Sequence, residues 1–146
     1  MLKKYKTFIS KYIFLSLLLS YSLLIANDLT VTVTKIQGDK GDILIGVYNR
    51  DDGSFADISK YYKKVAVKID GKRVSTTFKG LPNGVYAVAV IHDENQNKKI
   101  DKNFLGIPTE GYGFSNNHRF MMRGATFKES QFKLDKDKEI VVEMGY

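Results

Sequence analysis

The residues best suited to chemistry in this sequence lie in one segment rich in carboxylate and amide side chains, residues 92–101. Oxygen-bearing side chains occur there at positions 1, 3, 5 and 9 of a run that begins at Asp93. A curled loop with this spacing directs several oxygens at one centre, as Ca²⁺ requires, and the backbone carbonyl at position 7 adds another ligand. The candidate calcium ligands are Asp93, Asn95, Asn97, the carbonyl of Lys99, and Asp101.

Two features of the segment weaken the calcium interpretation. Position 6, where such loops usually place Gly, is Lys98, and position 12, where they place a bidentate Glu, is Phe104. Asx side chains at alternate positions also build turns without an ion, because they accept hydrogen bonds from the backbone that follows them. The sequence therefore supports two hypotheses, a weak Ca²⁺ site and a metal-free loop held by Asx turns.

Four residues around this segment are candidates for ligand contact: His92, Glu110, Tyr112 and Phe114. His92 ends an apolar strand and is either a ligand or a ring that orients the loop through a carbonyl or carboxylate. Glu110 either completes an ion shell or accepts hydrogen bonds from loop amides. Tyr112 and Phe114 either stack on a ligand or form a minor core beneath the loop.

The sequence has few residues and motifs that are typical of enzymes. The chain has no Cys and two His, so thiol chemistry is excluded. It has no Gly-x-Ser-x-Gly elbow, no His-Glu-x-x-His and no phosphate-binding Gly-rich loop. The sequence therefore favours a non-catalytic module that contacts a protein or an envelope component. The alternatives are a carbohydrate- or small-ligand-binding module, and a hydrolase that uses His92 with a loop carboxylate.

The first 26 residues have the character of a secretory signal peptide. Four lysines precede the first carboxylate, Asp28, and an apolar run occupies residues 13–26. We expect cleavage after Ala26, with Ser22 as the second choice and an uncleaved anchor as the alternative. The run is shorter than the ~20 residues that a membrane helix needs. We therefore expect a periplasmic or secreted protein, with no membrane span after cleavage and a single domain over residues 27–146.

The charge of the exported part excludes one class of partner. The full chain carries 23 basic and 16 acidic residues, a net charge of +7. Four of the basic residues lie in the expected signal peptide, which leaves 19 against 16, or +3. This excess is too small to predict a nucleic-acid partner.

Alternation of apolar and polar residues predicts an all-β fold. About seven short strands are expected, and Asp70-Gly71 between two of them predicts a tight hairpin. This pattern is typical of an immunoglobulin-like or transthyretin-like sandwich, with a small barrel as the alternative. Only residues 54–64 show helical spacing. The expected strands cover residues 29–34, 43–48, 65–69, 74–78, 85–92, 132–134 and 140–144.

One connection is unusually long. Residues 93–124 show no convincing strand pattern, and loops of this length are commonly functional or disordered. This loop carries eight large apolar side chains that need somewhere to pack, so we expect it to be ordered and folded over one end of the sandwich. These side chains are Phe104, Leu105, Ile107, Tyr112, Phe114, Phe120, Met121 and Met122.

Three groups of residues in the central part of the chain form a specific pattern. They are Leu81, Pro82, Gly84, Tyr86 and Ala87; then His92, Asp93, Asn95, Asn97 and Asp101; then Gly106, Ile107, Pro108, Glu110, Gly111, Gly113 and Ser115. With this pattern the chain resembles, from Leu29 to Tyr146, a bacterial exported family filed as domain of unknown function 2141. The resemblance implies an extracytoplasmic β-sandwich and supplies no activity. Family members often have Gly where this chain has Lys98.

Overall fold

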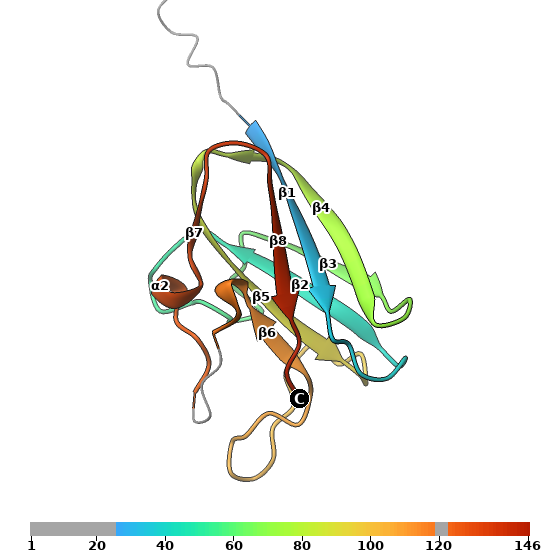
Figure 1. Ribbon diagram of the computed structural model, residues 1–146. Helices are drawn as coiled ribbons and strands as arrows, with labels where there is room; N and C mark the ends of the chain where they lie inside the picture. Colours follow the sequence, from blue (N-terminus) through green and yellow to red (C-terminus); the bar gives the residue numbers. More distant parts are fainter. Residues whose placement is uncertain (1–25, 119–122) are drawn as a thin grey trace, which may run out of the picture.

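The computed structural model describes residues 26–118 and 123–146, and they form two β-sheets packed face to face (Figure 1). The signal-peptide prediction concerns residues 1–26 and, apart from Ala26, lies outside this description. No helix among the described residues has the length and apolar character needed to span a membrane. The strands are β1 (Ala26–Thr34), β2 (Asp42–Tyr48), β3 (Lys63–Lys68), β4 (Arg73–Pro82), β5 (Gly84–Asp93), β6 (Tyr112–Phe114), β7 (Phe132–Leu134) and β8 (Lys138–Glu143).

The strand order confirms an all-β sandwich. One sheet has the order β4-β1-β8, in which β1 pairs antiparallel with β4 and parallel with β8. The other has the order β3-β2-β5-β6, all antiparallel, and β7 adds to the start of β5. Two separate sheets replace the alternative of a closed barrel.

The core lies between the sheets and follows the predicted alternation. In β1 the side chains of Leu29, Val31 and Val33 are fully buried, and in β5 Val88 and Val90 face them from the other sheet. Each such side chain contributes roughly 1.5–3 kcal/mol through removal from water. Residues 43–48 are apolar on both faces of their strand, which is typical of a central strand, and β2 lies between β3 and β5.

The outer face of the β4-β1-β8 sheet is polar. The hydroxyl groups of Thr30 and Thr77 lie 2.9 Å apart, and those of Thr32 and Ser75 lie 3.1 Å apart. The Thr32 hydroxyl also donates to Glu139 at 3.4 Å. This ladder between strands suits a face in water. The opposite sheet has a very different outer face, described below.

The predicted hairpin at Asp70-Gly71 is wrong, although the turn itself forms. Gly71 has φ +79°, which a tight reversal requires. The strands on either side of the turn, β3 and β4, belong to different sheets. Turn residues specify that the chain reverses, but the register of neighbouring strands decides which sheet receives the returning strand.

Two further expectations need correction. Within residues 54–64, which were expected to be helical, 54–62 form turns and bends and 63–64 begin β3. Asp52 and Asp57 hold the turns, because each accepts a hydrogen bond from the serine two residues on. A short helix, α2 (Phe127–Ser130), forms elsewhere, and Thr126 and Glu129 cap its start. Inside the segment expected to lack strands, β6 pairs with β5 and is followed by the 3₁₀ turn η1 (Ser115–Asn117).

Candidate functional site

Asp93 closes the first turn of the loop that follows β5. Its side chain is 1% exposed, and each carboxylate oxygen accepts a backbone amide. One oxygen accepts from Asn97 at 3.0 Å and the other from Lys98 at 2.8 Å. A buried carboxylate is tolerated only with such partners, so Asp93 holds the turn in one conformation.

Three of the predicted calcium ligands converge. The side-chain amides of Asn95 and Asn97 donate to the two carboxylate oxygens of Asp101, at 2.5 and 3.0 Å. The amide oxygen of Asn95 accepts the backbone N–H of Asn97, and that of Asn97 accepts the N–H of Lys99. These are the Asx turns of the metal-free hypothesis. Each oxygen retains a second lone pair, so the calcium hypothesis stays a prediction.

The carboxylates alone do not make a metal centre. Across residues 26–118 and 123–146 no three His, Cys, Asp or Glu side chains gather as a metal site requires. A cation in this loop would therefore depend on the amide oxygens of Asn95 and Asn97 as well as on Asp93 and Asp101.

A calcium titration tests this ligand set. With a Kd of about 1 mM, about 10 mM Ca²⁺ would add about 1.4 kcal/mol of stability and raise the melting temperature by about 5 °C. Asp101→Asn keeps the side-chain shape but removes one charged ligand, so the calcium-dependent rise should disappear. The measurement is thermal unfolding with Ca²⁺ and with Mg²⁺ as control. An unchanged wild-type melting temperature contradicts the prediction.

Lys98 adopts a backbone conformation that favours glycine. Its φ is +61°, as is that of Gln96 two residues before. The loop therefore makes the same sharp turn that glycine would permit, at a cost of roughly 1–2 kcal/mol for a residue with a Cβ.

Lys98→Gly is therefore expected to stabilise the protein by about 0.5–1 kcal/mol, because glycine has no Cβ to strain but loses more freedom on folding. Lys98→Ala is the matched control, since it removes the charge and keeps the strain. Urea denaturation of both variants measures the difference. Equal stability of the two variants contradicts the interpretation.

Glu110 fastens the two ends of the same loop. It is 6% exposed, and its carboxylate accepts the amide of Glu94 at 3.0 Å and that of Asp101 at 2.9 Å. The amide of Thr109 also donates to the carbonyl of Asp101. Glu110 thus has the local structural contacts that were one of its two predicted roles.

His92 has a similar structural position. Its ring is 1% exposed; Nε2 lies 2.8 Å from the carbonyl of Lys40, and Nδ1 lies 2.8 Å from the hydroxyl of Tyr146. A carbonyl only accepts, so Nε2 carries the proton and the Tyr146 hydroxyl donates to Nδ1. That hydroxyl accepts the amide of Gln37 at 2.9 Å. Both ring nitrogens are thus engaged, and neither is available to a ligand.

A second feature is an apolar groove on the outer face of the β3-β2-β5-β6 sheet. Strand register aligns two rows of side chains across this face, because alternate residues of each strand point the same way. Small residues, Gly46 and Ala89, occupy the middle of one row, so the floor of the groove is low there. One row is Lys64, Gly46, Ala89 and Phe114, and the other is Ala66, Leu44, Ile91 and Tyr112.

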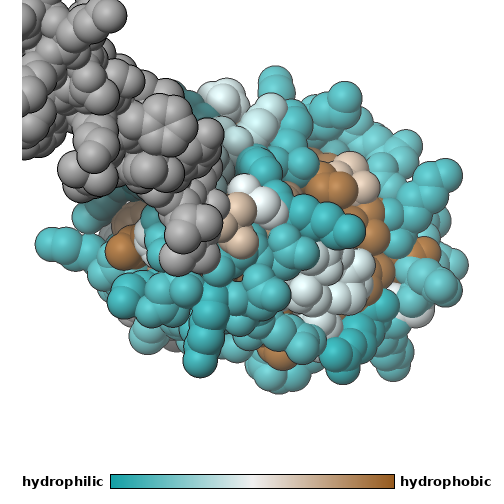
Figure 2. Space-filling model, turned by 90° about the horizontal axis from the view of Figure 1, so that it is seen from above, coloured by the Kyte–Doolittle hydropathy of each residue, from teal (hydrophilic) through white to brown (hydrophobic). Residues whose placement is uncertain are grey.

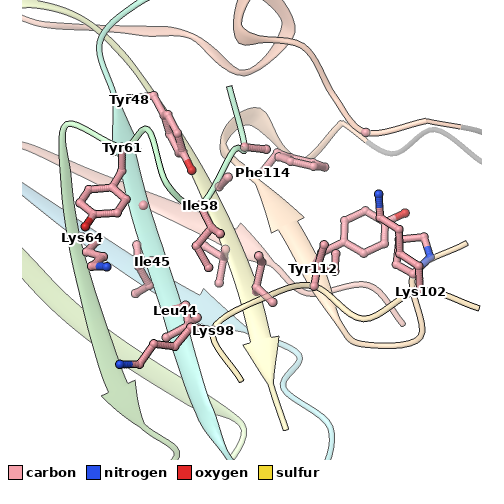
Figure 3. A pocket seen from close by; sticks show the side chains of 18 of the residues that line it. Leu44, Ile45, Tyr48, Ile58, Tyr61, Lys64, Lys98, Lys102, Tyr112 and Phe114 are labelled. Atoms are coloured by element: carbon pink, nitrogen blue, oxygen red, sulfur yellow. The ribbon is translucent and has the colours of Figure 1, made fainter. Parts of the chain in front are cut away.

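Two loops raise the sides of the groove. Ile58 and Tyr61 belong to the connection between β2 and β3, and Leu105 and Ile107 belong to the hairpin of residues 102–108. The enclosed space is about 1090 Å³. Figure 3 shows Tyr61 on one side of the groove, Tyr112 on the other and Ile58 between them. This volume is slightly larger than that of most small-molecule sites, which is roughly 300–1,000 Å³.

Positive charges surround the apolar floor. Lys64, Lys98 and Lys102 all line the groove, and Figure 3 places them on different sides of it. The Lys64 ammonium lies 4.3 Å from the centre of the Tyr61 ring. Lys98 and Lys102 make no ion pair with any residue in the described ranges. The groove therefore combines an apolar interior with a cationic rim.

The two predicted stacking residues have different positions. Tyr112 is half-buried in the groove, whereas Phe114 is 8% exposed and packs in a small second core. Phe55 contacts Phe114 and Tyr48 in this core.

Burial, with the nearby Asp57, raises the pKa of Tyr48 to about 12. Its hydroxyl donates to the carbonyl of Asp57 at 3.1 Å, which holds the groove's end wall in place.

The fold and these two features define the class of protein: a two-sheet β-sandwich with a hydrogen-bonded loop beside an open apolar groove. The chain belongs to the family described as uncharacterized protein conserved in bacteria, domain of unknown function 2141, whose sequence model matches residues 31–142. It has no match among curated proteins and none among solved structures.

Proposed function

We propose that this chain is an exported binding module that holds an anionic amphiphile, a molecule with an apolar body and a negatively charged end, in the groove. The observation that supports this most strongly is the groove's composition, an apolar floor bordered by Lys64, Lys98 and Lys102. An apolar ligand body gains from leaving water, and an anionic end gains from the lysines without the loss of an existing ion pair.

The asymmetry of the sandwich supports the same proposal. The outer face of β4-β1-β8 is covered by threonine and serine hydroxyls, which suit water. The outer face of β3-β2-β5-β6 carries Leu44, Ile91 and Tyr112 instead. An apolar face that stays in water is unfavourable in a monomeric protein and commonly marks a binding site.

The geometry favours this ligand class over the alternatives. A sugar requires many convergent hydrogen-bond partners, whereas the groove interior is largely aliphatic and aromatic. A hydrolase that uses His92 requires a ring nitrogen within reach of substrate, but both nitrogens already bond to Lys40 and Tyr146. A calcium ion at Asp93 and Asp101 would support the proposal structurally, by stiffening the loop that carries Lys98 and Lys102.

Binding of dodecanoate, followed by isothermal titration calorimetry below its micelle concentration, tests the proposal. Dodecanoate should bind saturably, and dodecyltrimethylammonium, which has the same chain length and the opposite charge, should bind at least tenfold more weakly. Ala66→Phe places a ring on the exposed groove floor and should abolish binding. Aromatic residues are well tolerated in strands, so folding should be retained.

Val141→Phe is the matched control for this experiment. Val141 is exposed on the outer face of the other sheet, so a ring there leaves the groove unchanged. Dodecanoate should bind this variant as it binds wild type. If Ala66→Phe also binds like wild type, or if neither amphiphile binds, the proposal is wrong.

A further inference from the structure

The hairpin of residues 102–108 exposes three large apolar side chains at one end of the molecule. Phe104 is 94% exposed, Leu105 67% and Ile107 51%. In Figure 1 this hairpin projects beyond the ends of the strands. We call Phe104, Leu105 and Ile107 its apex; Leu105 and Ile107 also border the groove, whereas Phe104 does not line it. The face shown in Figure 2 is mostly hydrophilic, with some apolar patches between the hydrophilic residues. Exposed apolar side chains clustered as they are in the hairpin mark a contact surface.

The backbone of the apex is already hydrogen-bonded within the hairpin. The side-chain oxygen of Asn103 accepts the amides of Leu105 and Ile107, at 3.0 and 3.1 Å. The Asn103 amide donates to the carbonyl of Ile107, and the amide of Gly106 donates to the carbonyl of Asn103, each at 2.9 Å. These four amides therefore need no water, which lowers the cost of entering an apolar medium.

Three lysines lie at the start of the hairpin or in the few residues before it. Lys98, Lys99 and Lys102 are exposed and make no ion pair within the described ranges. The nearest carboxylates are largely committed, because Asp101 accepts two asparagine side chains and Glu110 is buried against loop amides. Lysines without an ion pair, next to exposed apolar side chains, suit the surface of a bilayer in which acidic headgroups lie above the acyl interior.

We infer that this apex inserts into the surface of an anionic lipid bilayer. A membrane interface fits three features of the hairpin: it projects from the molecule, four of its amides are bonded internally, and Lys98, Lys99 and Lys102 lie in it or just before it in the chain. A protein partner would instead need a cavity shaped to receive Phe104. The inference is independent of the ligand in the groove, since Phe104 does not line it, although Leu105 and Ile107 lie at its edge. Bilayer contact would place the groove mouth beside lipid.

The absence of tryptophan from the sequence permits a direct test. Phe104→Trp places a single fluorophore at the apex, in protein purified after export with its N-terminus verified by mass spectrometry. Vesicles of phosphatidylglycerol mixed with phosphatidylcholine should shift its emission to shorter wavelength. Vesicles of phosphatidylcholine alone should shift it much less. Val141→Trp, at an exposed apolar position on the outer face of β8, should show no shift with either.

Two variants separate this inference from the proposed ligand site. Lys99→Gln leaves the groove lining unchanged and should weaken partition onto anionic vesicles about fivefold. Ala66→Phe should bind vesicles like wild type even where it has lost dodecanoate. If the emission of the Phe104→Trp protein is unchanged by anionic vesicles, or responds equally to neutral ones, the inference is overturned and the apex serves a protein partner.

Discussion

Replacing Gly41 with alanine is expected to destabilise the protein by more than about 4 kcal/mol, enough to unfold much of it. A Cβ on Gly41 would lie 2.0 Å from the carbonyl oxygen of Asp93 and 2.6 Å from the Cα of Glu94. Both are backbone atoms, so no side-chain rotation relieves the overlap. Gly41 also has φ +78°, which adds conformational strain to the steric overlap.

Gly38→Ala separates these two costs. Gly38 has the same φ of +78°, but a Cβ there meets nothing within 4 Å. The control should therefore lose only about 1 kcal/mol. Urea unfolding followed by circular dichroism measures both variants. If they lose equal stability, the close approach of Gly41 to the start of the loop is not as the structure has it.

Glu110→Ala is expected to cost about 2–4 kcal/mol, because it leaves two part-buried amides, those of Glu94 and Asp101, without their acceptor. The melting temperature should fall by about 10 °C. Hydrogen exchange by NMR should show these two amides losing protection more than amides of the sandwich core. Such a pattern is expected because Glu110 joins both ends of the loop.

Glu94→Ala is the control for this prediction. The Glu94 side chain is 49% exposed, so its loss should change stability by no more than about 0.5 kcal/mol. A Glu110→Ala protein as stable as the Glu94→Ala protein contradicts the role assigned to Glu110. Uniformly faster exchange over the whole chain also contradicts it, because the effect would then be global.

The hydrogen-bonded loop and the groove are structurally connected. Asp93 and Glu110 hold the loop in one shape, and that loop carries Lys98 and Lys102 to the rim of the groove. A flexible loop would have to lose conformational freedom when a ligand arrived. The buried hydrogen bonds therefore favour ligand binding as well as stability.

Sequence patterns predicted most of the strands because the core imposes a period of two. The alternation in β1 identified its buried face, Leu29, Val31 and Val33, and its threonine face. The strand β6 was missed because it has three residues, one of them Gly113, which is too short for a pattern. The side of the sandwich reached after Gly71 was also missed, since it depends on strand pairing over long sequence distances.

The site was only partly predictable, because some of its contacts also join residues that are far apart in the sequence. Asp93, Asn95, Asn97 and Asp101 were identified because their partners lie within a few residues. The partner of His92 is the last residue, Tyr146, and no spacing rule connects them. The groove depends on small residues of three strands meeting across the sheet. Gly46, Ala66 and Ala89 were visible in the sequence, but their register was not.

Dodecanoate binding in the groove can be located by NMR titration of ¹⁵N-labelled wild-type protein. Saturable shifts are expected at the amides of Gly46, Ala66 and Ala89 on the groove floor. Amides of β4 and β8 on the opposite sheet should stay unchanged. If no amide shifts, or if only those of the threonine-rich face shift, the groove is not the binding site.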